Sequence, residues 1–278
     1  MESCDMKKLF VLFVFLISFI SVNAADNVIE STGTLSYRKT TDFHSQWITV
    51  VKAPAGNERR FFPAFAPDGT PALCAGRFGK NEMPMARYIF GNGSSGTPAL
   101  FDMSGAGEEK AFTAQVDFLF HRQHSRPLER VEISLDIVSA DQKTVYHSSL
   151  YANGNIWNQN NFKIQQIDLT NQTKKPKTIL WKTINAKLEK GAWYRLKLNV
   201  VRMNETSRSP ITLKLALYEI EDKKSGGKDG KSIAEAVSKI MPNLGSRIQF
   251  SITEPALPPY VLYLNNISAA SGLKKKSN

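Results

Sequence analysis

Apolar and polar residues alternate with a period of two along most of the later two-thirds of the chain. The clearest example is the segment KGAWYRLKLNVVR, Lys190 to Arg202, in which Tyr194 shares the phase of Leu196. Its apolar face carries Leu196, Leu198 and Val200, and its polar face carries Arg195, Lys197 and Asn199. Successive side chains of a β-strand point to opposite faces, so the pattern predicts a strand with one buried face.

The same alternation recurs in AFTAQVDFLFH, RVEISLDIVS and ITLKLALYEIE. Further strands are predicted at Val145–Tyr151, Phe162–Leu169, Ile179–Lys182, Arg247–Thr253 and Tyr260–Ile267. One-sided alternation is typical of antiparallel sheets that bury one face. Two such sheets packed face to face cover each other's apolar sides. The sequence therefore predicts an all-β fold built as a two-sheet antiparallel sandwich.

One segment carries a helix signal instead. Ser232 followed by Glu235 forms a capping-box pattern, in which the two side chains bond backbone N–H groups at the start of a helix. The residues that follow, IAEAVSKI, end shortly before Pro242, and proline cannot continue a helix. We predict one short helix here, as a decoration between two strands.

The first residues are typical of a cleaved signal peptide. Lys7 and Lys8 precede an unbroken apolar run from Leu9 to Ile20, which is short for a bilayer core. Small residues at Val22 and Ala24 suit signal peptidase, so we expect cleavage after Ala24 and a secreted or periplasmic protein.

Nothing in the composition divides the remaining chain into two domains. The predicted organisation is a signal peptide at residues 1–24, one sandwich domain at 25–270 with a less regular N-terminal part at 25–86, and a basic tail at 271–278. Cleavage would remove Cys4 and leave Cys74 alone, so no intrachain disulfide is expected and a hydrophobic core must hold the fold.

The formal net charge of +11 favours acidic partners, such as an anionic polysaccharide, an anionic membrane surface or nucleic acid. The lysines are partly concentrated in loops and in the C-terminal tail, and such runs are usually solvated. Solubility is therefore the simpler explanation. We expect no nucleic-acid partner for an exported protein and no membrane span after cleavage.

The order of the strand motifs resembles the concanavalin A-like (laminin G-like) jelly-roll β-sandwiches of exported bacterial proteins. The resemblance covers roughly Arg87 to Ala270 and rests on the strand start GAWY at Gly191–Tyr194 and the closing strand YVLYLNNI at Tyr260–Ile267. It implies a jelly roll and raises the expectation of a carbohydrate ligand. Members of this fold include sugar-binding modules, glycoside hydrolases, polysaccharide lyases and adhesive domains, so the resemblance does not fix the function.

Glu132 and Asp136 are the candidate catalytic residues. Laminarinase-like hydrolases of this fold carry Glu-x-Asp-x-Glu on one strand, and this segment is similar, with Ser134 in the central place and Asp136 in the last. A retaining mechanism needs its carboxyl groups about 5–5.5 Å apart, whereas residues four apart on a strand are separated by roughly 13 Å. We therefore lean against an enzyme, and keep a glycoside hydrolase or polysaccharide lyase as an alternative.

The loop ANGNIWNQNNF is the first candidate binding site. Trp157 lies among side-chain amides, of which Asn155 and Asn158 are the nearest predicted contacts. An exposed aromatic ring can stack on the apolar face of a sugar, while amides match sugar hydroxyls as donors and acceptors. The competing interpretation is an ordinary polar turn whose Trp folds back over the sandwich edge. Trp181 and Trp193, at strand ends, are expected to be packing residues.

The outward residues Arg195, Lys197 and Asn199 are the second candidate site, because arginine grips a carboxylate or sulfate with two parallel hydrogen bonds. The alternative is a solvated face with cross-strand pairs to acids such as Glu132 or Asp136. We expect no cofactor and no metal site, although the resemblance implies that a structural calcium would find oxygens at Asp68 or Asp102.

These observations predict an exported, lectin-like β-sandwich that binds carbohydrate, with anionic glycans as the finer expectation. A structural or adhesive envelope protein without a small ligand is a further alternative to the enzyme named above.

Overall fold

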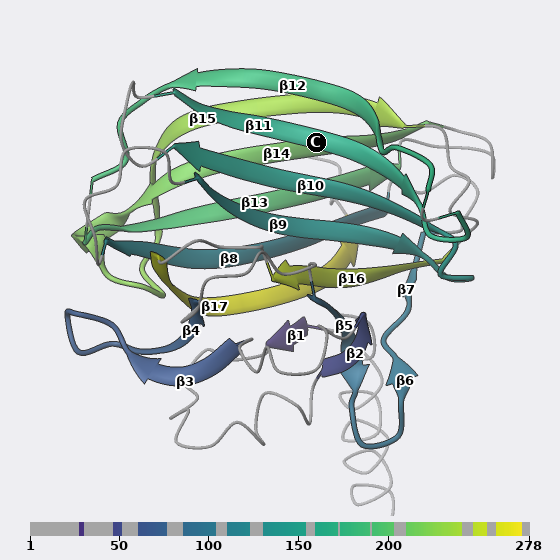
Figure 1. The fold of residues 1–278 in the computed structure, drawn as a ribbon, viewed down its shortest axis with the longest axis horizontal. Helices are drawn as coiled ribbons and strands as arrows, with labels where there is room; N and C mark the ends of the chain where they lie inside the picture. The colour runs from purple at the N-terminus through teal and green to yellow at the C-terminus, as the bar shows by residue number, and fades with distance from the viewer. Residues whose placement is uncertain are drawn as a thin grey trace, which may run out of the picture.

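The computed structural model describes residues 28–30, 47–51, 61–76, 86–103, 110–122, 130–153, 159–171, 173–189, 191–202, 210–240, 247–254 and 260–273. These residues form two antiparallel sheets that lie in two layers (Figure 1). Among them, no helix has the length and apolar character needed to cross a membrane. The predicted signal peptide at 1–24 lies outside the described residues.

One sheet has eight strands among the described residues. Its order is β15 (Asp229–Ile240), β14 (Ile211–Ile220), β13 (Trp193–Arg202), β8 (Lys110–Arg122), β17 (Tyr260–Leu273), β4 (Pro71–Gly76) and β3 (Phe61–Phe65), with β1 (Val28–Glu30) also paired to β17. A short 3-10 turn, η1 (Glu221–Lys223), follows β14. Strand β17 continues to Leu273, three residues into the segment predicted as a basic tail.

The other sheet has nine strands in the described part of the chain. Its order is β12 (Lys177–Asn185), β11 (Gln159–Asp168), β10 (Thr144–Asn153), β9 (Arg130–Ser139), β16 (Arg247–Glu254), β5 (Ala86–Asn92) and β2 (Trp47–Val51). The short strand β6 (Thr97–Pro98) pairs with β5, and β7 (Phe101–Asp102) pairs with β16.

The two sheets seal their apolar faces against each other. Phe112 of β8 lies 6.3 Å, ring centre to ring centre, from Phe250 of β16 in the other sheet, and 4.4 Å from Phe101. Each fully buried Leu, Ile or Phe contributes about 1.5–3 kcal/mol of hydrophobic stabilisation. The core residues come from both layers, as the sequence alternation predicted.

The segment from Lys190 to Arg202 supplies a central strand of the eight-stranded sheet. Strand β13 lies between β8 and β14, with Asp117 opposite Arg195 and Val116 opposite Leu196. Its inward residues Tyr194, Leu196, Leu198 and Val200 are buried in the core, which confirms the predicted phase.

The helix predicted at Ser232–Ile240 is wrong, because this segment is the edge strand β15. Ala236 and Ile240 face the core opposite Leu215 and Ile211 of β14. Pairing with β14 holds this segment as a strand, which has no helix N-terminus for Ser232 and Glu235 to cap.

Strand β12, at one edge of the nine-stranded sheet, lies close to β15, at one edge of the eight-stranded sheet. The Lys182 ammonium of β12 donates to the Glu235 carbonyl oxygen of β15 at 2.6 Å. The two edge strands thus meet along one side of the sandwich (Figure 1).

Candidate functional site

The charged residues predicted on the outer face of β13 are bonded to neighbouring strands. Arg195 is 5% exposed. Its Nε and Nη2 donate to the two oxygens of Asp117 on β8 at 2.6 and 2.9 Å. Its Nη1 donates to Asp229 of β15 at 2.8 Å, and the Lys197 ammonium bonds the second oxygen of Asp229. Arg195 and Lys197 therefore use these donors for hydrogen bonds within the protein.

Burial alone would raise the pKa of Asp229, but the hydrogen bonds from Lys197 and Arg195 outweigh burial and lower this pKa. The outer face of β13 therefore carries cross-strand ion pairs, as the alternative interpretation expected. The acids in these pairs are Asp117 and Asp229. Glu132 and Asp136 lie on β9 in the other sheet, so pairing of β13 with them is wrong.

The other predicted contacts divide into described and undescribed residues. The side-chain oxygen of Asn199 accepts a hydrogen bond from Thr113 of β8 at 2.8 Å. Asn155, Trp157 and Asn158 fall in residues 154–158, outside the described part of the chain, and their binding role stays a prediction.

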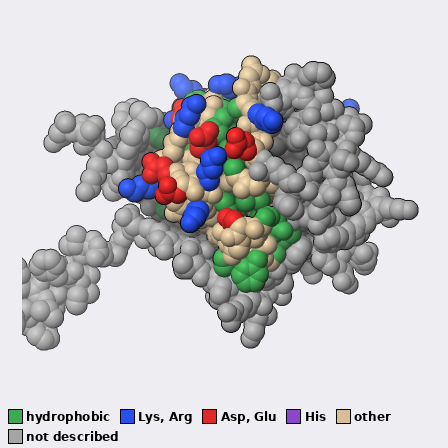
Figure 2. Space-filling view, turned by 90° about the vertical axis from the view of Figure 1, so that its left-hand side faces the viewer, with side chains coloured by type: hydrophobic (Ala, Val, Ile, Leu, Met, Phe, Trp, Pro, Cys, Tyr) green, Lys and Arg blue, Asp and Glu red, His purple; other side chains and the backbone are tan. Residues whose placement is uncertain are grey.

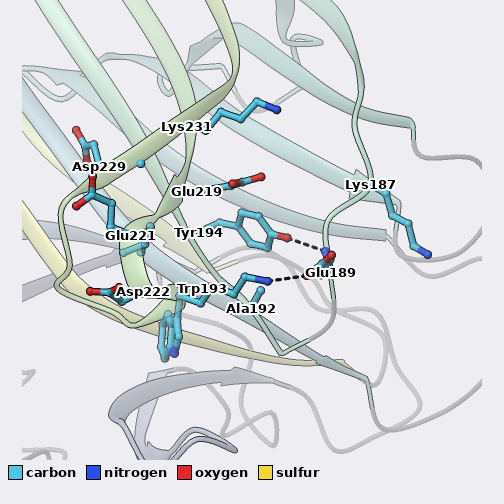
Figure 3. Close-up of a pocket in the computed structure, with 13 residues that line it drawn as sticks. Lys187, Glu189, Ala192, Trp193, Tyr194, Glu219, Glu221, Asp222, Asp229 and Lys231 are labelled. Carbon is cyan, nitrogen blue, oxygen red and sulfur yellow. Dashed lines mark hydrogen bonds and ion pairs between the residues drawn. The ribbon is translucent and has the colours of Figure 1, made fainter.

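A pocket of about 560 Å³ opens beside the start of β13 (Figure 3). The segment between β12 and β13, the first residues of β13, the end of β14, η1 and the start of β15 surround it. Its lining residues are Lys187, Glu189, Ala192, Trp193, Tyr194, Glu219, Ile220, Glu221, Asp222, Lys223, Asp229, Gly230 and Lys231. Its size lies in the range of small-ligand pockets.

Polar contacts hold the walls of this pocket together. The Tyr194 hydroxyl accepts a hydrogen bond from the Glu189 N–H at 2.7 Å, and the Lys223 ammonium donates to the Glu189 carboxylate at 3.3 Å (Figure 3). The indole N–H of Trp193 donates to Asp68 at 2.7 Å. Figure 2 shows basic and acidic side chains interspersed on one side of the molecule, with no single-sign patch among the coloured residues.

A different surface carries an exposed aromatic residue. Trp181 of β12 is 56% exposed, so the expectation that it is a packing residue is wrong. Its ring lies 6.3 Å from that of Tyr151 on β10, and the Lys163 ammonium of β11 lies 5.7 Å from the Tyr151 ring centre. Trp193, by contrast, is 1% exposed, as predicted.

The strand register places polar groups in two rows beside these rings. One row across four strands is Thr183, Asn161, Tyr151 and Glu132, and the adjacent row is Trp181, Lys163, Ser149 and Ser134. Four strands at about 4.8 Å spacing span roughly 14 Å. We call the surface formed by Trp181, Tyr151, Lys163, Asn161, Thr183 and Glu132 the aromatic strip.

The strip ends in a chain of ion pairs that becomes more deeply buried toward the middle of the sheet. Lys163 contacts Glu132 at 2.8 Å, and Glu132 contacts His147 Nε2 at 3.0 Å. His147 Nδ1 contacts Asp136 at 3.0 Å. The side chains of Glu132, His147 and Asp136 are 20%, 4% and 1% exposed.

The two carboxylates set the protonation state of His147. Burial would lower the pKa of His147, but the charge and hydrogen bonds of Asp136 and Glu132 outweigh burial and raise this pKa to about 10. Burial would raise the pKa of Glu132, but hydrogen bonds from His147, Lys163 and Ser149 lower this pKa to about 2. At neutral pH the ring is therefore an imidazolium held between two acids.

This geometry gives no support to Glu132 and Asp136 as a catalytic pair. A general acid needs a pKa close to the working pH, and the pKa of Glu132 is moved away from it. Asp136 is 0% exposed and accepts hydrogen bonds from the Thr253 hydroxyl and, at 3.3 Å, the Ser148 N–H. Both oxygens of Asp136 are thus engaged within the protein.

The described residues contain no group of three or more His, Cys, Asp or Glu side chains placed to bind a metal ion. Asp68, one of the two residues considered for calcium, accepts hydrogen bonds from the Thr70 N–H at 3.0 Å and the Trp193 indole at 2.7 Å. Asp102 is exposed on β7.

Two residues of this region escaped the sequence interpretation. Trp181 was assigned to packing, although Ile184, three positions on, is buried and so has the opposite phase. His147 was not considered, although the short turn between Ser139 and Thr144 sets a hairpin register that puts His147 opposite Asp136.

Plant lectins are among the solved structures of similar fold. The winged bean acidic lectin, complexed with methyl-α-D-galactose, matches with a TM-score of 0.50 and 10% identity over 90% of this chain and 100% of that chain. Lectin I from Ulex europaeus, in complex with the methyl glycoside of α-L-fucose, has a TM-score of 0.48 and 9% identity over 88% and 98% of the two chains. No protein-family model and no curated protein matches the sequence.

The chain therefore has the concanavalin A-like jelly-roll fold, a two-sheet antiparallel sandwich that the sequence predicted. At 10% identity the likeness establishes the fold and not the residues of a site.

Proposed function

We propose that this protein binds carbohydrate on the outer face of the nine-stranded sheet, through the aromatic strip. The observation that carries the proposal is Trp181, an indole 56% exposed on the outer face of the sheet beside the ring of Tyr151. A sugar ring offers an apolar face ringed by hydroxyl groups, so an exposed indole beside donors and acceptors is a suitable partner.

The neighbours of Trp181 supply both kinds of hydrogen-bonding group. Lys163 offers donors, Glu132 offers acceptors, and Asn161 offers both. All three lie in the two rows that contain Trp181 and Tyr151. The strip is most exposed at Trp181 on β12, whereas the side chains of Lys163 and Glu132 are 15% and 20% exposed, so it suits a glycan held mainly at the β12 edge.

The fold comparison supports a sugar ligand in general terms. The winged bean lectin, which shares the fold, is complexed with methyl-α-D-galactose. The predicted signal peptide adds that binding takes place outside the cytoplasm, where polysaccharides are accessible.

An anionic glycan is the finer proposal, and the formal net charge of +11 supports it. Long-range attraction raises the local concentration of an anionic ligand and falls with salt. The local charges of Lys163 and Glu132 cancel, and Arg195 and Lys197 are engaged with acids. We therefore expect any preference for anionic over neutral glycans to weaken between low and moderate salt.

Trp181→Ala is expected to weaken glycan binding about tenfold or more, because a central aromatic contact commonly carries at least 1.4–2 kcal/mol of affinity. The measurement is a glycan array at low and moderate salt, followed by titration of the best ligand. Phe65→Ala is the matched control, since Phe65 is an aromatic residue 68% exposed on β3 of the other sheet.

Equal binding by native protein and Trp181→Ala would contradict the strip as the site. Loss of binding in Glu219→Ala alone would move the site to the pocket, and loss in Trp157→Ala alone would move it to residues 154–158. No binding to any glycan would leave the structural or adhesive alternative. Release of reducing sugar from mixed polysaccharides, abolished by Glu132→Gln, would instead establish the hydrolase alternative.

A further inference from the structure

Arg87 of β5 is a buried cation with unused hydrogen-bond donors. The residue is 5% exposed, and its Nε and Nη1 atoms make no hydrogen bond within the described part of the chain. Arginine remains protonated in proteins, so this position holds a full positive charge.

A second unbonded polar group lies beside Arg87. Ser251 of β16 is 0% exposed, and its hydroxyl has no hydrogen-bond partner among the described residues. Thr253 stands opposite Arg87 in the β5–β16 ladder, which makes Ser251 a diagonal neighbour of Arg87 on the same outer face.

The charges of the described residues around Arg87 do not cancel. Burial lowers the pKa of Arg87, and the charge of Asp136 opposes that change. Asp136, however, already holds His147, which also binds Glu132. The described ionisable groups here are the cations Arg87, His147 and Lys163 and the anions Glu132 and Asp136. Three positive groups face two negative groups, so one positive charge is left over.

A net charge among buried groups is costly, because burial removes the hydration of Arg87, and Asp136, which is shared with His147, replaces it only in part. A bound anion removes that cost. We propose that the protein binds one small monovalent anion, a halide or the carboxylate of a small organic acid, between Arg87 and Ser251. The guanidinium N–H groups and the serine hydroxyl donate to it, and a single negative charge neutralises the group.

Trp181, the residue that carries the carbohydrate proposal, is remote from this anion site. In the nine-stranded sheet, its strand β12 and the Arg87 strand β5 are five strand spacings apart, or about 24 Å. Glu132 of the aromatic strip lies nearer, on β9, and shares in the charge balance of the anion site. The tests at Trp181 and at Arg87 therefore report on the two proposals separately.

The test compares thermal unfolding in sodium chloride, sodium formate and sodium gluconate at equal ionic strength. Gluconate is a monovalent anion too large for a buried site. We expect the midpoint in chloride or formate to exceed that in gluconate by about 3–6 °C at a tenfold excess over the dissociation constant. Arg87→Met should abolish the difference, and Ser251→Ala should raise the anion concentration needed for it.

Arg247→Met is the matched control, because Arg247 is an exposed arginine on β16, the strand of Ser251. This variant should keep the full difference in midpoint between the salts. Bromide-soaked crystals should show an anomalous peak within hydrogen-bond distance of Arg87, a readout that does not depend on any variant folding. Identical midpoints in all three salts, or a full difference retained by Arg87→Met, would overturn the proposal.

Discussion

Asp117→Asn is expected to lower the free energy of unfolding by about 3–5 kcal/mol, the usual cost of removing one partner of a buried ion pair. Asp117 is 0% exposed. Its Oδ1 accepts from Arg195 Nε, while its Oδ2 accepts from Arg195 Nη2, the Ser225 hydroxyl, the Gly226 N–H and the Asn266 amide.

An asparagine cannot replace this arrangement. In the described part of the chain, the groups bonded to Asp117 are all donors, from Arg195, from β17 and from the turn before β15. An amide would turn its own NH2 group toward one of these donors, and Arg195 would keep only the acid Asp229 as a charged partner. The loss therefore combines a missing charge with an unpaired donor.

Denaturant titration measures the effect, and Glu235→Gln is the matched control. Glu235 pairs with Lys214 at 2.9 Å, with side chains 41% and 37% exposed, and exposed pairs contribute about 0–1 kcal/mol. If Asp117→Asn lost no more stability than Glu235→Gln, the buried Asp117–Arg195 ion pair would contribute no more than an exposed pair. Adding Arg195→Met to Asp117→Asn should recover part of the loss, since it removes the uncompensated charge.

The free energy of unfolding should also be greatest between about pH 4.5 and 6.5. The pKa of His147 is raised from 6.5 to about 10, against the effect of burial, by Asp136 and Glu132. Its stabilisation is therefore fully present below pH 6.5 and disappears as the pH rises through about 10. The pKa of Glu132, despite burial, is lowered from 4.5 to about 2 by His147, Lys163 and Ser149. Its stabilisation is present above pH 4.5 and disappears as the pH falls through about 2.

Denaturant titrations across pH test both limbs. His147→Gln should remove the alkaline loss that His147 causes, and should move the acid loss to higher pH, because Glu132 then keeps only Lys163 of its two cationic partners. Asp168→Asn is the control, since Asp168 lies at an exposed strand end with Thr170 and Lys174, and it should leave the alkaline limb unchanged. An unchanged pH profile in His147→Gln would show that the imidazolium does not couple to folding.

The fold was predictable because a strand with one buried face has apolar and polar residues in alternation along its sequence. Long strands such as β9, β13 and β14 have strongly apolar inward sets, so their phase is unambiguous. The prediction failed at β15, where the inward residues opposite β14 are Ala234, Ala236, Ser238 and Ile240. Three of these four are small, and so the capping-box pattern of Ser232 and Glu235 was the stronger local signal.

Trp181 was misjudged for a related reason. Ile179, Leu180 and Trp181 are consecutive apolar residues, so alternation alone does not say which of them faces outward. The β-bulge between Ile164 and Gln165 of the neighbouring strand blurs the phase further.

Ion-pair partners were beyond sequence reasoning when they came from distant strands. Asp117 and Arg195 are 78 positions apart and meet only because β8 inserts next to β13. His147 and Asp136, in contrast, share one hairpin, so turn length was sufficient information in principle.

The edge strands of the sandwich have a consequence for solubility. Each sheet ends in a long strand, β12 or β15, whose outer backbone groups are a template for addition of another chain. Lys177 and Lys182 are exposed on β12, and Lys231 and Lys239 on β15. Repulsion between such lysines disfavours the stacking of one molecule onto the next. Part of the excess positive charge therefore protects this β-protein against fibrous aggregation, independently of any ligand.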